Sequence, residues 1–546
     1  MLSTFARALA VLLACLSFVH MSPVACSSSN YPDLLEATAE DLVSGLESGL
    51  WTSVDLVTAY TLRIQEVQSL LNTVTEINPD AIAIAQTLDA ERANGTLRGP
   101  LHGLPMLIKN NIATLDKMNN TAGSYSLIGA KVPRDSTIAA KLRKAGVVIL
   151  GKTNLSQWAN FRSSNSSNGW SAYGGQVYGA YAPNMDPSGS SSGSGVGSSI
   201  GLAFATLGTE TSGSILSPSS QNNLVGIKPT VGLTSRSLVI PISEHQDTVG
   251  PMARTVADAA YVLTAIAGKD EYDNYTSAQP FDTPPDYTRA LNFSSLRGAR
   301  IGIPRNGIYG GRGEEPVLAA FEEAIQVMKN AGAIIVDNTN FTAWDDYASD
   351  PNGYASIVLD ADFVSDLANY LSQLTYNPNN ITSLADESRF TKSFPLEDYP
   401  ERDTAVWDES LALGYNNSDS RFWQAYQTTS YWGGEGGVTG ALERYNLDAL
   451  ILPTDYSPGL PALAGLPGVT VPLGFYPPNT TVITSPPWNL TGTGPNIPFG
   501  LSFLGAKWSE ETLIGFAYAY EQRTMTRNKV QPFIQPNTQL EDVIGM

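Results

Sequence analysis

Cysteine and histidine are scarce in this sequence. Cys15 and Cys26 are the only cysteines, and both fall in or beside an apolar leader, so the remaining chain has no disulfide and must be stable from its core alone. Beyond the leader only His102 and His245 remain, and neither C-x-x-C nor H-E-x-x-H occurs. The spacing recommends no metal site, and we expect neither a metal nor a cofactor.

Positive charge is also scarce. The chain has 32 lysines and arginines against 52 aspartates and glutamates, which gives a formal net charge of −20. Long-range repulsion then disfavours binding to nucleic acid or to an anionic membrane surface. We interpret the excess of acid as a surface that keeps the protein in solution.

Apolar runs long enough to cross a bilayer are absent. The leader MLSTFARALAVLLACLSFVHM carries one arginine and a short apolar run, and the small residues VACS follow, which is the pattern of a secretory signal peptide. No later stretch reaches the roughly 18 apolar residues that a membrane-spanning helix needs. We therefore expect a signal peptide at residues 1–26 and a secreted, extracellular monomer or homodimer with no membrane span.

Eleven N-x-S/T sequons fit passage through a glycosylating export pathway. Asn154 is a poor acceptor among them, because it lies in a run that we expect to be packed. The better candidates include Asn94, Asn165, Asn274, Asn340 and Asn489.

Helix and strand signals alternate along the chain. Ser136 precedes a helical stretch that ends at Gly146, and the apolar run VVIL follows. Pro316 and Gly332 bracket a second helix, which the run AIIV follows. Further strands are expected at ARIGIP, DALILP and GVTVPLGF. This alternation predicts an α/β fold, with a mixed, twisted central sheet flanked by helices.

The chain shows no second core of its own. We expect a single large domain over residues 27–546, which 546 residues with 42% hydrophobic content can fill. Between about Trp344 and Tyr445 the pattern loosens and becomes rich in Asn, Tyr and Trp. We expect residues 344–445 to form a variable insertion that covers the sheet.

The stretch PSGSSSGSGVG, residues 187–197, has the composition of a flexible linker. It runs directly into small and apolar residues from Ile200 to Leu207, for which we expect a buried helical segment. A Gly/Ser loop that enters a buried helix presents backbone N–H groups and hydroxyls at one point. This context favours a site over a linker.

Three kinds of site compete for this stretch. GSSSG fits the G-x-S-x-G nucleophile elbow with Ser191, but the preceding APNMDPS is no strand and the two histidines are poorly placed for a triad. A metal site has too few ligands. The third candidate is a lysine base, because Lys109 ends the apolar run LPMLI, where a strand would carry its amine inward. A snorkelling lysine is the ordinary alternative.

Six segments, taken together, resemble the amidase signature family. They are GPLHGLPMLIKNNI, LGKTNLSQWANF, GSSSGSG, LGTETSGSI, VGIKPTVG and DTVGPMARTVADAA, in the family's order, and the likeness extends over nearly the whole mature chain. Within the family, FRSSNSSNGWSAYGGQ and PISEHQDTVGPMARTVADAAYVLTAIAGKD look most like the peptide amidase branch.

This resemblance implies a Ser-Ser-Lys triad. The acyl-forming serine falls on Ser214, the bridging serine with its cis peptide bond on Ser190, and the lysine on Lys109. Backbone N–H groups of Thr211, Ser212, Gly213 and Ser214 would line the oxyanion hole, which binds substrate. Lysine is a base only when neutral, so desolvation must lower its pKa from about 10.4.

Two positions depart from the pattern of the family. Ser212 stands where peptide amidases usually have an acidic residue, and Asn110 stands where the family usually has Asp. The first change keeps the backbone donor and removes a charge beside the nucleophile. The second is nearly isosteric.

The implied function is hydrolysis of a carboxamide C–N bond through an acyl-enzyme on Ser214. The substrate would be a peptide or a small-molecule amide. A fatty-acyl or aryl amide or ester hydrolase of the same family is the alternative, and a secreted, non-catalytic binding protein is a third possibility that the intact triad argues against.

Overall fold

The computed structural model describes residues 31–309 and 315–545. The expected signal peptide and both cysteines lie outside these residues. Within them, no helix combines the length and the apolar character that crossing a membrane requires.

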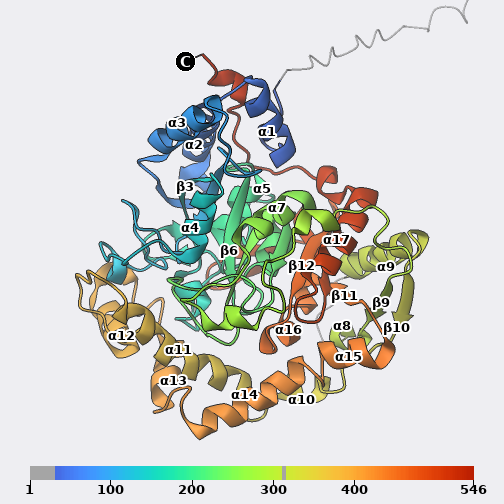
Figure 1. Ribbon diagram of the computed structural model, residues 1–546. Coiled ribbons are helices and arrows are strands. Elements are labelled where there is room, and N and C mark those ends of the chain that lie inside the picture. The colour runs from blue at the N-terminus through green and yellow to red at the C-terminus, as the bar shows by residue number, and fades with distance from the viewer. Residues whose placement is uncertain (1–30, 310–314, 546) are drawn as a thin grey trace, which may run out of the picture.

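An eleven-stranded mixed sheet forms the centre of the molecule (Figure 1). Parallel pairs lie near both ends, β3–β2–β6 and β11–β9–β10, and an antiparallel run from β6 to β11 joins them. In sheet order the strands are β1 (Val74–Ile77), β3 (Val148–Thr153), β2 (Pro105–Lys109), β6 (Ala205–Glu210), β8 (Thr248–Ala253), β7 (Val225–Lys228), β12 (Gly468–Phe475), β15 (Pro498–Leu504), β11 (Ala449–Pro453), β9 (Arg300–Ile303) and β10 (Ile334–Asp337). The expected mixed sheet is confirmed.

Helices pack on this sheet in groups. Beside it lie α5 (Ser192–Ser199) and α6 (Leu216–Gln221), which contact each other, and α7 (Val256–Ile266), α9 (Glu315–Asn330) and α17 (Glu510–Thr524). The remaining helices outside the insertion are α1 (Ala39–Ser48), α2 (Ser53–Leu71), α3 (Ala81–Ala93), α4 (Thr137–Lys144), α8 (Arg305–Tyr309) and α16 (Gly459–Leu463). Two small sheets complete the fold, β4 (Trp170–Ser171) with β5 (Gly175–Gln176), and β13 (Ile483–Ser485) with β14 (Leu490–Thr493).

The helix boundaries expected from the sequence are confirmed. The hydroxyl of Ser136 accepts the N–H of Ala139 at the start of α4, and Gly146 takes a φ of +82° just beyond its end. Gly332 likewise has a φ of +94° after α9. Both positions need a left-handed turn, which glycine adopts without steric cost.

The expected helix over Ile200–Leu207 is wrong. That stretch is buried, but the helix lies earlier, at α5, and β6 begins at Ala205. This helix consists almost entirely of glycine and serine, because close packing around it leaves no room for larger side chains. A Cβ on Gly193 would lie 2.3 Å from the carbonyl oxygen of Thr73.

The residues from 344 to 445, called the cover segment below, form helices between β10 and β11. They are α10 (Trp344–Ser349), α11 (Tyr354–Ser372), α12 (Leu384–Ser393), α13 (Ala405–Ala412), α14 (Ser420–Gly433) and α15 (Val438–Tyr445). Figure 1 shows α10 to α14 gathered at the side of the molecule opposite α1 to α3.

Buried contacts attach the cover segment to the body. Arg162 and Glu397 form an ion pair of 3.0 Å with both side chains almost fully buried. The ring of Trp407 packs edge-on against that of Trp158, with centroids 5.9 Å apart. The segment therefore shares its core with the loops beside the sheet.

Candidate active site

Lys109 lies at an edge of the sheet where two parallel strands end. β2 pairs in parallel with β6, with Ile108 opposite Leu207, so Lys109 and Thr209 reach the same edge. All five residues of β2 are buried, and Lys109 is 0% exposed. The expectation that a strand carries this amine inward is confirmed.

The amine of Lys109 is surrounded by hydroxyl groups. Its Nζ lies 2.8 Å from Ser190 Oγ, 3.0 Å from Ser191 Oγ and 2.9 Å from Thr209 Oγ1. Burial lowers the pKa of Lys109 to about 7, although the negative charges of Asp247 and Glu210 act in the opposite direction. A large fraction of this lysine is therefore neutral near neutral pH and available as a base.

Ser190 and Ser191 differ in what their hydroxyl protons do. Ser191 donates its proton to the carbonyl oxygen of Thr209 at 3.1 Å and accepts the Thr209 N–H. Ser190 Oγ has no hydrogen bond to any described residue other than Lys109. The proton of Ser190 is thus free to enter the lone pair of a neutral Lys109. The peptide bond before Ser190 is cis, as the resemblance implied.

The nucleophile-elbow hypothesis for Ser191 does not fit this geometry. Ser191 is 0% exposed and stands at the N-terminus of α5 with no strand directly before it. Its hydroxyl accepts a hydrogen bond from Lys109 Nζ and so helps to position that amine. An elbow would instead present the hydroxyl at the surface of a pocket.

The loop that contains Ser214 follows β6. Its shape is fixed by Glu210, whose Oε2 accepts the N–H groups of Ile215 and Leu216 at 2.7 and 2.8 Å. Gly213 has a φ of +82°, and a Cβ there would lie 3.3 Å from Pro458. Glycine is therefore required at the centre of this turn.

The loop that contains Ser214 is bonded to the loop that contains Ser190 and Ser191. The N–H of Ser191 donates to the carbonyl oxygen of Ser214 at 3.3 Å, which joins the two serine-containing loops. Ser214 is 8% exposed, and its hydroxyl has no hydrogen-bond partner in the described part of the chain. Lys109 is thus hydrogen-bonded directly to Ser190, and the backbone of Ser214 is hydrogen-bonded to Ser191, the residue that follows Ser190.

The residues expected at the oxyanion hole form the same loop. The hydroxyl of Thr211 donates to Asp247 Oδ1 at 2.5 Å, and Asp247 Oδ2 in turn accepts two backbone N–H groups. Ser212 is exposed, so the missing acidic side chain at this position would have faced solvent or substrate. Gly213 lies between it and Ser214.

Asn110 has well-defined partners. Its Nδ2 donates to Thr75 Oγ1 at 2.7 Å, and its Oδ1 accepts the N–H of Thr121 at 2.9 Å. An aspartate could make only the second bond in this arrangement, because Thr75 already donates to the carbonyl oxygen of Lys152. The local structure therefore suits the amide.

Two further lysines are fully buried, but their surroundings differ from those of Lys109. Burial lowers the pKa of Lys152 to about 7 and that of Lys228 to about 8. Lys152 donates to Asn120 Oδ1 and a carbonyl oxygen, and Lys228 donates to the carbonyl oxygen of Leu466. Carbonyl and amide oxygens cannot give up a proton, so neither lysine has a group to deprotonate.

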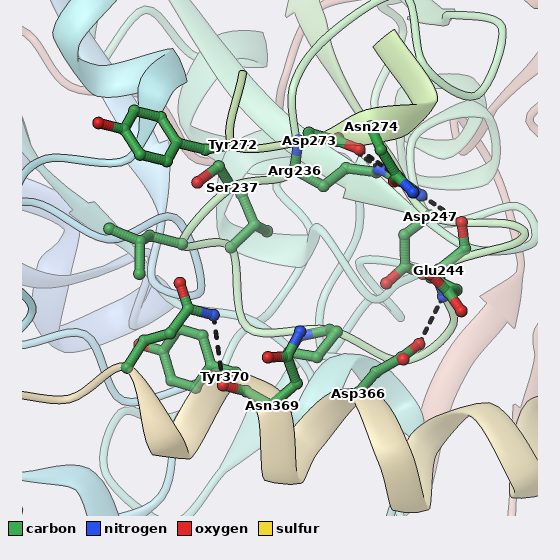
Figure 2. A pocket seen from close by; sticks show the side chains of 14 residues that line it. Arg236, Ser237, Glu244, Asp247, Tyr272, Asp273, Asn274, Asp366, Asn369 and Tyr370 are labelled. Carbon is green, nitrogen blue, oxygen red and sulfur yellow. Dashed lines mark hydrogen bonds and ion pairs between the residues drawn. The ribbon is translucent and has the colours of Figure 1, made fainter. Parts of the chain in front are cut away.

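Two pockets lie near the loop that contains Ser214. One, of about 600 Å³, is lined by aromatic and apolar side chains, among them Phe341, Trp344 and Tyr347, and reaches Pro458 beside Gly213. A smaller cavity, with room for no more than about one water molecule, is lined by Thr209 and Thr211. It shares residues with a polar pocket of about 700 Å³ under α11 (Figure 2).

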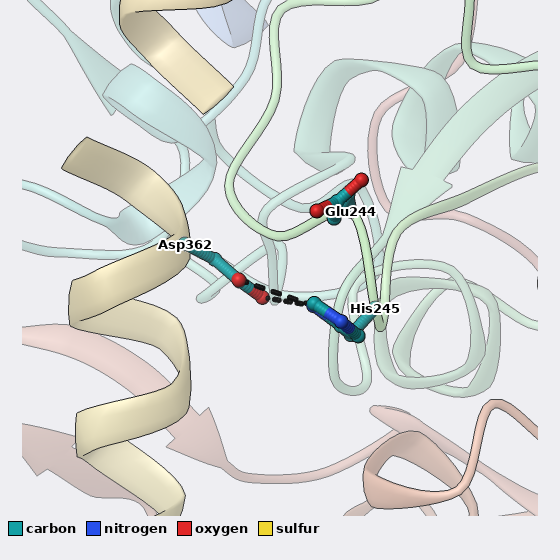
Figure 3. A group of neighbouring side chains, drawn as sticks. All are labelled: Glu244, His245 and Asp362. Carbon is teal, nitrogen blue, oxygen red and sulfur yellow. Dashed lines mark hydrogen bonds and ion pairs between the residues drawn. The ribbon is translucent and has the colours of Figure 1, made fainter. Parts of the chain in front are cut away.

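Both histidines make structural hydrogen bonds. His102 is buried and lies 3.0 Å from the carbonyl oxygen of Leu88 through Nε2. His245 Nδ1 lies 2.8 Å from Asp362 Oδ2, and Figure 3 shows Asp362 reaching it from α11 with Glu244 nearby.

Glu244, His245 and Asp362 are the metal-ligand candidates that the spacing of the sequence did not reveal. The oxygens of Asp362 are already engaged, since Oδ2 accepts the hydroxyl of Ser243 and Oδ1 accepts the amide of Asn417. We therefore interpret this cluster as a hydrogen-bonded link between the loop at 243–245 and the cover segment.

Some residues of the site gave no signal in the sequence. Thr209, Glu210 and Asp247 each act on Lys109 or on the loop at 211–214, yet none belongs to a spacing pattern of a catalytic site. Asp247 reaches Thr211 across 36 positions of sequence. Only their places within LGTETSGSI and DTVGPMARTVADAA, two of the segments that carry the resemblance, could have drawn attention to these residues.

Comparison with known proteins gives consistent matches. A family model described as "Amidase" matches residues 55–514. A protein of Arthroderma benhamiae named "Putative amidase" is 54% identical over 545 residues, covering 96% of this chain and 91% of that protein. The native peptide amidase from Stenotrophomonas maltophilia is 38% identical with a TM-score of 0.81, covering 92% and 99% of the two chains. An amidase family protein from Bacillus anthracis is 31% identical with a TM-score of 0.80, covering 92% and 93%.

Proposed function

Because the chain is an amide hydrolase of the amidase family, in its peptide amidase branch, we propose a specific reaction for it. The protein cleaves terminal carboxamides of peptides to the acid and ammonia. Ser214 is the nucleophile, Ser190 transfers the proton, and Lys109 is the base. The contact of 2.8 Å between Lys109 Nζ and Ser190 Oγ is the observation that carries this assignment.

The reaction begins with attack of Ser214 Oγ on the carbonyl carbon of the substrate. Ser190 takes the proton of Ser214 while its own proton moves to neutral Lys109. The carbonyl oxygen becomes an oxyanion, which the N–H groups of the loop at 211–214 stabilise by about 3 kcal/mol for each donor. No metal or cofactor takes part in this scheme.

The tetrahedral intermediate then loses its amine. Lys109 returns the proton through Ser190 to the leaving nitrogen, the C–N bond breaks, and ammonia departs. The acyl group stays on Ser214 as an ester. A water molecule then attacks this ester in the same way. Lys109 accepts the proton of the water through Ser190, and the acid and the free serine are released.

A short chain end suits this site better than a continuous peptide. Ser214 is only 8% exposed, and Asp362 of the cover segment binds Ser243 and His245 in the loop that ends at Asp247, the partner of Thr211. A terminal amide with a small leaving group needs little room beyond Ser214. Internal peptide bonds would need space for chain on both sides.

A second substrate class is favoured by one observation. The pocket of about 600 Å³ beside Gly213 is lined with aromatic side chains, which suit an aryl or fatty-acyl group. Hydrolysis of such amides or esters is therefore the alternative function. A non-catalytic binding role would not need a buried lysine, whose burial costs stability.

Export and glycosylation complete the proposal. The leader at residues 1–26 would direct the chain out of the cell. Asn94, Asn165, Asn274 and Asn489 are exposed, as glycan acceptors must be. Asn154 is 0% exposed and its Nδ2 donates to two carbonyl oxygens, so it is unsuited to carry a glycan.

Mass spectrometry on a short amidated peptide and its free-acid twin tests the proposed substrate. We expect a gain of about one mass unit in the amidated peptide and no change in the free acid, because NH₂ is replaced by OH. Internal fragments from both peptides would contradict the proposal. Rapid hydrolysis of a fatty-acyl or aryl amide without reaction of the peptide would favour the alternative.

A further inference from the structure

The polar pocket under α11 is lined mainly by residues that the reaction does not use. It encloses about 150 Å³, or about 700 Å³ when its opening to solvent is included, and it is formed by the loop at 236–247, by residues 272–274 and by one face of α11 (Figure 2). Through Arg236, Val239 and Asp247 it adjoins the smaller cavity at Thr209 and Thr211. It therefore lies beside the loop that contains Ser214.

Carboxylates without ion pairs dominate the charge of this pocket. Glu244, Asp247 and Asp366 line it, and none of them forms an ion pair with a lysine or arginine among the described residues. The cation in the lining is Arg236, which Asp273 engages through two side-chain contacts of 2.8 and 2.7 Å. The pocket is thus suited to a ligand whose positive charge favours the ionised form of these carboxyl groups.

Two of these carboxylates have an oxygen left for a ligand. Asp366 uses Oδ2 to accept the N–H of Glu244 at 2.6 Å, and Glu244 uses Oε1 to accept the amide of Asn417 at 3.2 Å. Their second oxygens have no hydrogen-bond partner in the part of the chain that the structure describes. Asp247, by contrast, is held by Thr211 and two backbone groups.

Two buried side chains offer further unused polar atoms. Tyr370 lines the pocket and is 3% exposed, and its hydroxyl makes no hydrogen bond to any described residue. Asn111 is 2% exposed and lines the adjoining cavity, and its Oδ1 is buried without a partner. Buried polar atoms are normally paired, so these acceptors point to a ligand that donates hydrogen bonds.

We propose that this pocket binds the protonated amino group of the substrate, so that the preferred substrates are amides whose acyl part carries a free amine, such as short peptide amides with an unblocked amino terminus. An ammonium group supplies three N–H donors and a positive charge, which matches the free oxygens of Glu244 and Asp366. This inference rests on the proposed function and specifies its substrate class.

Binding of an ammonium group should release a proton. Burial and the neighbouring charges of Asp362, Glu244 and Asp247 raise the pKa of Asp366 to about 9, so this carboxyl is largely protonated at neutral pH. Arg236 is the positive group that faces the same pocket, and it remains paired with Asp273. A bound cation favours the ionised form of Asp366 and lowers its pKa.

The test compares peptide amides of increasing length, each with a free and with an acetylated amino terminus. For the length that spans the site, we expect KM to be about 10-fold lower with the free amine, because a desolvated ion pair is worth at least one factor of ten. Asp366→Asn and Glu244→Gln should each remove this difference and leave hydrolysis of the acetylated peptide nearly unchanged. Asp345→Asn, an exposed carboxylate of α10 outside the pocket, is the matched control.

Binding to the Ser214→Ala protein separates this inference from the proposed function. Calorimetric titration with the unblocked peptide amide should give a Kd about 10-fold lower than with the acetylated twin, accompanied by proton release at pH 7. Equal affinities at every length would overturn the inference even if turnover is seen. Tight binding without turnover by the wild-type protein would instead overturn the proposed function. Displacement of the peptide by calcium, reversed by EDTA, would show that the pocket is a metal site and would overturn the inference that it binds an amino group.

Discussion

The Nζ atom of Lys109 lies 2.8 Å from the hydroxyl oxygen of Ser190, and 3.0 Å from that of Ser191. The two serines are neighbours in sequence and almost equally close to the amine. They differ in the use of the hydroxyl proton, because Ser191 donates its proton to the carbonyl oxygen of Thr209 and Ser190 does not. Substitutions at these two positions should therefore have unequal effects.

The first prediction concerns the three serines. Ser214→Ala should lower kcat by about 10⁴-fold or more, and Ser190→Ala by about 10²-fold to 10⁴-fold, with unchanged folding. Ser191→Ala removes one hydrogen bond to Lys109 and should cost about 10-fold. Steady-state kinetics with circular dichroism as the folding control measures this. A lethal Ser191→Ala with a tolerated Ser214→Ala would instead support the nucleophile elbow.

A second prediction is chemical labelling. A serine-reactive fluorophosphonate should modify Ser214, which retains 8% exposure and whose hydroxyl has no partner among the described residues, and not Ser190 or Ser191, which are 0% exposed. Peptide mapping by mass spectrometry locates the adduct. Pretreatment with EDTA should leave labelling and turnover unchanged, and restoration of lost activity by a divalent ion would reveal a metal mechanism.

The pH dependence of turnover gives a third prediction. Lys109 acts as a base only when neutral, and its pKa is lowered to about 7, so kcat/KM should rise with pH through one ionisation near 7. Glu210→Gln should move this ionisation to lower pH. Its side-chain oxygen can still accept the N–H groups of Ile215 and Leu216, while the negative charge that raises the pKa of Lys109 is gone. A shift to higher pH would contradict the assignment.

The same lysine should also make the stability of the folded protein depend on pH, in a direction that its pKa determines. The folded pKa of Lys109 lies below its unfolded value of 10.5, so the folded state binds fewer protons and loses stability as pH falls from about 10.5 toward 7. Lys109→Met removes this penalty. The difference in Tm between variant and wild type should therefore become more positive from pH 9 to pH 7. Thermal unfolding at a series of pH values measures it, with a pH-independent difference as the contrary result.

Close packing of α5 gives a fifth prediction. A Cβ on Gly193 would meet the carbonyl oxygens of Thr73 and Asn154 at 2.3 and 2.6 Å, so Gly193→Ala should lower the free energy of unfolding by about 3 kcal/mol. Gly492→Ala is the matched control, because no atom lies within 4 Å of its added Cβ. Urea denaturation of both variants measures the difference. Equal stability of the two would contradict the packing argument.

The sequence predicted the parts of the site that lie in local patterns. Lys109 follows an apolar run, and that run is a buried strand; Ser136 and Gly146 bound the helix between two strands as capping chemistry requires. The helix at Ser192–Ser199 was missed, because serine and glycine have low helix propensity and only tight packing makes them suitable.

The pocket under α11 could not be predicted by such patterns. Glu244 and Asp366 are 122 positions apart and meet only when α11 lies across the loop at 236–247. Each carboxylate alone is indistinguishable from the many acidic residues of a chain with a net charge of −20. The burial that makes them informative is a property of the fold.

The position of the cover segment in the chain has an evolutionary consequence. Lys109, Ser190 and Ser214 all precede β9, whereas residues 344–445 enter later, between β10 and β11. Descendants of this protein could thus lengthen, shorten or exchange that segment while keeping the three residues that we propose for the reaction. Selection could then alter the part of the substrate pocket that α11 supplies, Asp366 included, without changing the stretch of the gene that encodes the three proposed catalytic residues.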